Sequence, residues 1–210
     1  TINQAALRNG CSDNNPVTNP EAGFGGAIYN QGKLELNQTL LENNRAAHGG
    51  GAVHVATDAS LTVESTTLWR NFTASGGGGL LNQGSASLTN STLTGNSAAG
   101  DGGGLSNLGT GTLMLRFITI TENSAGGDGG GIANLSESSI QMQTSLLSEN
   151  THIDGKSQDC AGVLTSLGYN LVKEISGCSF LTMETDIINQ NSFILPLADN
   201  GGPTPTHALW

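Results

Sequence analysis

Apolar and polar residues alternate in short runs that recur along the whole chain. The clearest runs place aliphatic side chains two residues apart, as in Leu61/Val63 and Leu113/Leu115. A period of two is the signature of a strand with one buried face. Gly, Ser, Thr and Asn fill most of the remaining positions and disfavour helix. The pattern therefore predicts an all-β chain.

Three landmarks recur together: a glycine pair before an aliphatic residue, an alternating apolar pair, and an aliphatic residue three positions before an asparagine. The asparagine follows the apolar pair after ten residues, and the next glycine pair follows the asparagine after six. All variation lies between the glycine pair and the next apolar pair, which are nine or eleven residues apart. Two arcs of fixed length and one of variable length describe a closed coil, so we predict a solenoid.

We predict a right-handed parallel β-helix of about six coils of 25–27 residues, with three short strands in each coil. Stacking is required because one coil cannot bury its own apolar side chains. The coils are expected to span residues 1–179, with regular repeats over about 25–150 and a degenerate last coil over 151–179. Residues 180–210 break the pattern and are expected to form a tail that caps the open last coil.

One asparagine recurs at a fixed place in every regular repeat. We expect these asparagines to lie at a corner, where each amide bonds turn backbone and the asparagine of the next coil. They are interpreted as structural, and they are Asn44, Asn71, Asn96, Asn123 and Asn150. A second row consists of Asn30, Asn82, Asn107 and Asn134 and is interrupted by Val55. The glycine pairs are expected to serve a corner that needs positive φ or close backbone approach.

Composition and charge narrow the classes of function. The net charge of −10 repels phosphate backbones and argues against nucleic-acid binding, while neutral sugars, cations and proteins fit as partners. No apolar run approaches the ~18–20 residues of a membrane helix. The phosphate-loop and serine-elbow motifs are absent. Hydrolases and lyases on this fold need paired carboxylates or a base beside a cation, and the scattered acids disfavour enzymatic function.

Two places are candidate binding sites. Tyr29, His54 and Leu81 are expected in one outward row, where they would form a platform for a sugar ring; solvated or subunit-contacting surface is the alternative. Asp101 and Asp128 occupy the same corner one coil apart. Stacked carboxylates there would share a Ca²⁺ ion with loop carbonyls. We favour the alternative that Asp simply suits a glycine-rich turn, and we expect no other cofactor.

The three cysteines bear on the compartment. Cys160 and Cys178 flank a short segment after the repeats and are expected to form a disulfide, which fits an oxidising environment. Cys11 is then left unpaired.

The repeats resemble those of the polymorphic outer-membrane proteins among bacterial autotransporters. The end of the chain is similar to the choice-of-anchor family (type Q) of exported bacterial β-helix proteins, through Thr165-Ser166-Leu167-Gly168-Tyr169-Asn170-Leu171 and the stretch from Pro196 to Leu209. The resemblance implies secretion or attachment to a bacterial surface through a signal beyond residue 210. We therefore expect a surface adhesion, structural or ligand-binding module whose partner is a protein or polysaccharide. The alternative is a carbohydrate-active β-helix or an inactive polysaccharide-binding relative.

Overall fold

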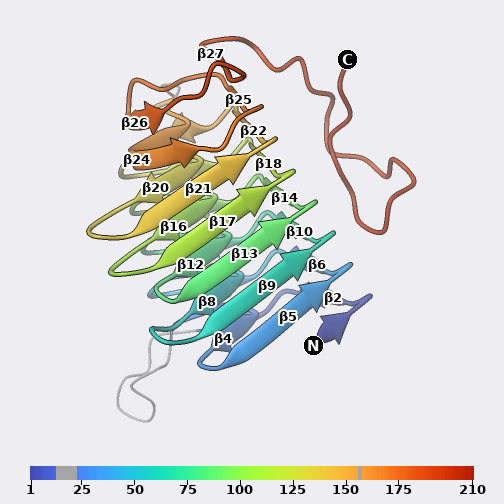
Figure 1. The fold of residues 1–210 in the computed structure, drawn as a ribbon. Coiled ribbons are helices and arrows are strands. Elements are labelled where there is room, and N and C mark those ends of the chain that lie inside the picture. The colour runs from blue at the N-terminus through green and yellow to red at the C-terminus, as the bar shows by residue number, and fades with distance from the viewer. Residues whose placement is uncertain (13–22, 156–157) are drawn as a thin grey trace.

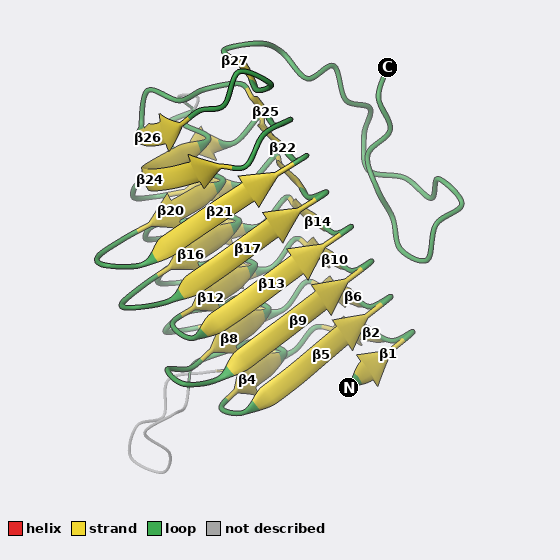
Figure 2. Cartoon of the chain, in the orientation of Figure 1, coloured by secondary structure: helices red, strands yellow, loops and turns green. Residues whose placement is uncertain are grey.

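The computed structural model describes residues 1–12, 23–155 and 158–210, which form one stack of coils (Figures 1 and 2). Strands pair with the equivalent strands of neighbouring coils, and every strand pairing in the stack is parallel. The described residues contain no helix. The predicted right-handed parallel β-helix of about six coils is confirmed.

Three sheets run along the stack, but each regular coil contributes four strand segments. The first sheet has 13 strands because it takes two segments from each coil, and β24 (Cys160–Ser166) joins the two rows by pairing with both. The predicted number of three therefore matches the number of sheets, but each coil contains four strand segments and not three.

The strands of the first sheet form two rows. The long-strand row contains β1 (Ile2–Asn3), β5 (Lys33–Asn37), β9 (Ser60–Glu64), β13 (Ser85–Thr89), β17 (Thr112–Arg116) and β21 (Ser139–Gln143). The glycine row, which follows the glycine pairs, contains β4 (Ile28–Asn30), β8 (Val53–Val55), β12 (Leu80–Asn82), β16 (Leu105–Asn107) and β20 (Ile132–Asn134). Both rows lead into β24, beyond which β26 (Cys178–Leu181) continues the sheet.

The other two sheets consist of shorter strands. The second sheet contains β2 (Ala6–Arg8), β6 (Leu40–Glu42), β10 (Thr67–Trp69), β14 (Thr92–Thr94), β18 (Thr119–Thr121), β22 (Leu146–Ser148), β25 (Leu171–Val172) and β27 (Ile187–Ile188). The third sheet contains β3 (Cys11–Ser12), β7 (Arg45–Ala46), β11 (Phe72–Thr73), β15 (Ser97–Ala98), β19 (Ser124–Ala125) and β23 (Thr151–His152).

The core is a set of aliphatic columns along the stack axis. Leu41, Leu68, Leu93, Ile120 and Leu147 align in register in the second sheet, and each is at most 2% exposed. Burying such side chains contributes about 1.5–3 kcal/mol each. Because each coil covers the next, the apolar columns explain why the strands stack in this register.

The glycine pairs turn one corner of each coil. In the pair that opens β12, Gly77 has a φ of 71°, a region that L side chains rarely adopt. Its neighbour Gly78 passes so close to the next coil that a Cβ atom there would lie 2.1 Å from the carbonyl oxygen of Gly103. Both predicted reasons for glycine at this corner are confirmed.

The arc of variable length is the turn between the glycine row and the long-strand row. It has two residues, 83 and 84, between β12 and β13, but four residues in the coils on either side, 56–59 and 108–111. The short turn therefore leaves a notch in the edge of the stack.

The last part of the chain divides into two pieces. Strands β26 and β27 lie on the last coil, paired with β24 and β25. The remainder returns along the side of the stack (Figure 1), where Thr67 donates to the carbonyl of Pro205 at 2.7 Å and His207 contacts the hydroxyl of Thr94 at 3.0 Å. Ser192 and residues 204–207 thus lie against the second sheet and not across the end of the stack.

Candidate binding surface

The outward face of the glycine row is covered by the molecule itself. Tyr29, His54 and Leu81 align in register, but His54 is 2% exposed and Leu81 is 3% exposed. The Phe24 ring packs on His54 with 4.7 Å between ring centroids, and the backbone at Gly49 lies directly over Leu81. The expectation of an open aromatic platform is therefore wrong, because the preceding corner folds back over the row.

His54 illustrates what this covering does. Its Nε2 atom contacts the side-chain oxygen of Gln83 at 2.9 Å. Burial lowers the pKa of His54, while the hydrogen bond to Gln83 opposes that shift. The imidazole is therefore a neutral packed side chain at pH 7 and not a ligand for a sugar.

The outward face of the second sheet is covered by the returning tail. The outward side chains of Thr67 and Thr94 are fully buried, and both contact the tail. Near the end of the stack, the Ser148 hydroxyl donates to that of Ser192 at 2.7 Å. The hydroxyls that this sheet would present to solvent are used to hold the tail.

The outward face of the long-strand row, in contrast, is open. In β13 and β17 the inward residues Ala86, Leu88, Leu113 and Leu115 are buried, whereas the alternate residues are partly or fully exposed. The register is unbroken across five strands. We call the outward residues of β9, β13, β17 and β21 the long-strand face: Ser60, Thr62, Glu64, Ser85, Ser87, Thr89, Thr112, Met114, Arg116, Ser139, Gln141 and Gln143.

Two shallow hollows mark this face. One, of about 370 Å³, lies over the middle of β13, β17 and β21, around Met114 and Gln141. The other, of about 270 Å³, is the notch left by the short turn, and Gln83 and Gly84 are among the residues that line it. Ser85 and Thr112 line both hollows, which therefore adjoin each other, and we call the two together the depression.

Charge on the row is concentrated at β5. Lys33 lies 3.3 Å from Glu35, and the Thr1 hydroxyl donates to Glu35 at 2.8 Å. The hydrogen bond from Thr1, with help from Lys33, holds the pKa of Glu35 below its ordinary value. Over β13 and β21 the outward side chains are uncharged. The middle of the face therefore offers hydroxyls, amides and one thioether, which suits a neutral partner.

Asp101 and Asp128 are adjacent across one coil step. The Asp101 carboxylate accepts a hydrogen bond from the backbone N–H of Asp128 at 2.7 Å. The Asp128 carboxylate accepts one from the side chain of Gln158 at 3.2 Å. Within residues 1–12, 23–155 and 158–210, no three His, Cys, Asp or Glu side chains are grouped so as to hold a metal ion. The geometry supplies a physical reason for Asp at this turn.

The asparagine ladder is confirmed, and it has one direction. In every step the side-chain N–H and backbone N–H donate to the Oδ1 atom of the next asparagine, as from Asn96 to Asn123 at 2.9 Å for both bonds. The second row bonds in the same sense from Asn82 to Asn107 and on to Asn134. The ladder amides are buried, so these bonds satisfy groups that water cannot reach.

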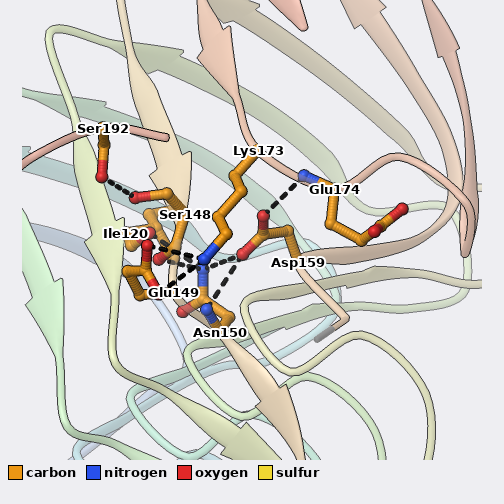
Figure 3. A network of polar contacts seen from close by, with 8 residues as sticks. All are labelled: Ile120, Ser148, Glu149, Asn150, Asp159, Lys173, Glu174 and Ser192. Atoms are coloured by element: carbon orange, nitrogen blue, oxygen red, sulfur yellow. Dashed lines mark hydrogen bonds and ion pairs between the residues drawn. The ribbon is translucent and has the colours of Figure 1, made fainter. Parts of the chain in front are cut away.

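The ladder ends on a carboxylate that sequence reasoning missed (Figure 3). Asp159 accepts from the backbone and side-chain N–H groups of Asn150 at 3.0 and 2.8 Å, and from the backbone N–H of Glu174 at 2.9 Å. Burial raises the pKa of Asp159 to about 6, although these hydrogen bonds oppose the shift. An acceptor-only group fits here because all three groups that bond to Asp159 are N–H donors.

A second polar column lies at the corner after the long strands. Backbone N–H groups of one coil donate to side-chain oxygens of the next, as from Thr39 to Thr66 at 3.2 Å and from Thr66 to Ser91 at 3.1 Å. This column also ends on a carboxylate, because Asn170 donates to Asp186. The recurrence of Thr or Ser five residues before the ladder asparagine was the available signal.

A disulfide joins Cys160 to Cys178, whereas Cys11 is free and exposed. The bond connects β24 to β26 and so fixes the last coil beside the end of the ladder.

Comparison with known proteins gives one local match. Residues 117–135 match the repeat of the Chlamydia polymorphic membrane proteins. This segment runs from one corner through β18 and β19 to β20 and carries Asn123 and Asn134, one from each ladder. Neither the curated proteins nor the solved structures give a match. The chain thus contains a segment similar to the repeat of the Chlamydia polymorphic membrane proteins, which agrees with that part of the expected resemblance.

Proposed function

We propose that this chain is an adhesion module of a bacterial surface, and that its long-strand face binds another macromolecule outside the cell. The observation that carries the proposal is the difference in exposure among three rows of strands: the glycine row, the second sheet and the long-strand row. The glycine row and the second sheet are covered, while the long-strand face is open over at least four coils. The long-strand face is therefore accessible to a partner, whereas the two covered faces are not.

The composition of the face indicates the mode of binding. Its middle has Ser, Thr and Gln side chains around Met114, with charges only towards Glu64 and Arg116. A flat polar surface with an adaptable apolar side chain suits a macromolecule bound over many weak contacts. The described residues offer no paired carboxylates beside the depression, so binding without bond cleavage is the function that the face supports.

The surface location is supported by two features. The matched repeat is that of the Chlamydia polymorphic membrane proteins, and the Cys160–Cys178 disulfide fits an oxidising compartment. Among the described residues, no helix has the length and apolar character to cross a membrane. Attachment through a choice-of-anchor signal remains part of the proposal.

The proposal is tested by placing a bulky charge on the face. Binding of the 210-residue protein to immobilised extracellular-matrix glycoproteins and to intact epithelial cells is compared with that of Met114→Arg and Ser87→Arg. Ile153→Arg is the matched control, because Ile153 is 73% exposed and follows β23 of the third sheet. We expect both face variants to reduce binding at least about tenfold, as for residues central to an interface, and the control to have no effect.

Equal binding by the face variants and the wild-type protein would contradict the proposal. So would saturable binding that only Ile153→Arg abolishes, since that result assigns adhesion to the third sheet.

A further inference from the structure

Two aromatic side chains project into solvent from one corner row. Phe117 is 55% exposed and Tyr169 is 67% exposed. Each occupies the corner between a long strand and the second sheet, with Thr144 in the coil between them. At a spacing of about 4.8 Å per coil, the two residues lie about 10 Å apart along the stack.

Folding does not account for aromatic residues at this corner. Phe117 has a φ of 54° and Tyr169 a φ of 62°. Other coils place Gln38, Ser65 and Asn90 here. A bulky side chain in this region is strained, and burial does not offset the strain because both rings are mostly exposed. Strain at an exposed position indicates a function other than packing.

The two rings border one groove. A hollow of about 350 Å³ lies between them and the returning tail, whose Ile194, His207 and Leu209 form the opposite side. Leu146 of the second sheet lines the same hollow. His207 joins the tail to the second sheet through a contact of 3.0 Å to the Thr94 hydroxyl, and within the tail it contacts the carbonyl of Leu195 at 2.7 Å. The lining contains no Asp, Glu, Lys or Arg side chain.

We propose that this hollow, the tail groove, binds an unbranched neutral polysaccharide, with its sugar rings packed on Phe117 and Tyr169. A sugar ring has an apolar face that packs on an aromatic ring and hydroxyls that need polar partners. Thr119 and Thr144 line the groove and supply hydroxyls. Aromatic rings two coils apart match alternate units of an extended glycan. The uncharged lining and the net charge of −10 disfavour an acidic glycan.

An extended peptide fits this groove less well. Peptides that add to a sheet bind along a free edge, where backbone N–H and C=O groups are unpaired. The second sheet contributes its face to the groove, and its backbone groups pair along the stack. The inference shares with the proposed function only the assumption that the chain works outside the cell, since the tail groove and the long-strand face are different surfaces.

The test is a calorimetric titration of the 210-residue protein with cellohexaose, chitohexaose and xylohexaose, with hexagalacturonate as the anionic comparison. Phe117→Asn and Tyr169→Asn are the informative variants, because Asn tolerates positive φ and should leave the melting temperature unchanged or higher. Ile153→Ser is the control, an exposed apolar residue outside the groove. We expect one neutral hexamer to bind, each Asn variant to weaken binding at least about tenfold, and the control to bind as the wild type does.

Three results would overturn the inference: no binding of the neutral hexamers, stronger binding of hexagalacturonate, or unchanged affinity in both Asn variants. Self-association that Phe117→Asn abolishes would also overturn it and assign the groove to a second copy. If either variant has a lower melting temperature, the test is instead the rate of Tyr169 nitration in the wild-type protein. The inference requires that bound hexamer slows this nitration. Met114→Arg separates this inference from the proposed function, since it should impair cell binding and leave hexamer binding intact.

Discussion

Replacing Asn96 by alanine removes a single amide from the middle of the ladder. The Oδ1 atom of Asn96 accepts from the backbone and side-chain N–H groups of Asn71 at 3.0 and 2.9 Å, and its Nδ2 atom donates to the Leu68 carbonyl at 2.9 Å. In Asn96→Ala the buried backbone N–H of Asn71 loses its acceptor, and the carbonyl of Leu68 loses a donor. At about 1–3 kcal/mol for each unsatisfied group, we expect the free energy of unfolding to fall by about 3 kcal/mol.

The assay is urea-induced unfolding at pH 7, followed by circular dichroism. Ser87→Ala is the matched control, because Ser87 lies on the open face of β13 and should change stability by less than about 0.5 kcal/mol. If Asn96→Ala and Ser87→Ala unfold at the same urea concentration, the ladder bonds do not stabilise the fold.

Asn96→Asp separates hydrogen bonding from volume. The aspartate retains the acceptor for Asn71 but loses both donated bonds, and it places a buried negative charge beside the Oδ1 atom of Asn123. We expect a larger loss than for alanine at pH 7, and partial recovery on acidification as the carboxyl group takes up a proton. A loss that does not change between pH 7 and pH 4 would refute the directed ladder.

Three further changes test other parts of the structure. Burial raises the pKa of Asp159 to about 6 from 3.8, so the folded state holds this proton more tightly than the unfolded chain does. The contribution of Asp159 to the free energy of unfolding is therefore greatest below pH 3.8 and falls by about 3 kcal/mol as pH rises through 6. Asp159→Asn should remove this fall from the pH profile of unfolding. Gly103→Ala should destabilise the protein by at least about 2 kcal/mol, because the added Cβ would lie 2.3 Å from a carbonyl oxygen of the next coil. Gly32→Ala should leave stability unchanged in the same unfolding assay, because no atom lies within 4 Å of the position of its added Cβ. Cys178→Ser should cost about 3 kcal/mol in thermal unfolding by opening the link to Cys160, 18 residues earlier.

The sequence predicts the stack well because its signals are local and repeated. The fixed intervals from apolar pair to Asn and from Asn to glycine correspond to arcs that cross the same two corners in every coil. The residues that end the ladders were not predicted, because Asp159 and Asp186 occur once each and lie outside the repeat. The role of these two residues depends on which N–H groups of the last coil lack an acceptor. The sequence of a repeat does not show which groups these are.

The candidate surface was the part that sequence reasoning judged wrongly. The outward direction of His54 and Leu81 follows from strand alternation, but their covering depends on the path of the glycine corner in the preceding coil. The covering of the second sheet depends on the tail, whose contacts with Thr67 join residues 137 positions apart. Such tertiary contacts carry no periodic signal. Strand alternation therefore shows which side chains point away from the core, but it does not show which of them are exposed to solvent.

Apart from the short strands of the third sheet, the stack has one open outward face, that of the long-strand row, while the outward faces of the glycine row and the second sheet are covered. Thiol reactivity tests this difference directly. In a Cys11→Ser background, Ser87→Cys, Leu81→Cys and Thr94→Cys each place one thiol on the outward side of a different row. Reaction with a maleimide under native conditions should be fast for Ser87→Cys and at least about 100-fold slower for the other two, which react only through local opening. Equal rates at all three positions, or a slow reaction at Ser87→Cys, would contradict the account.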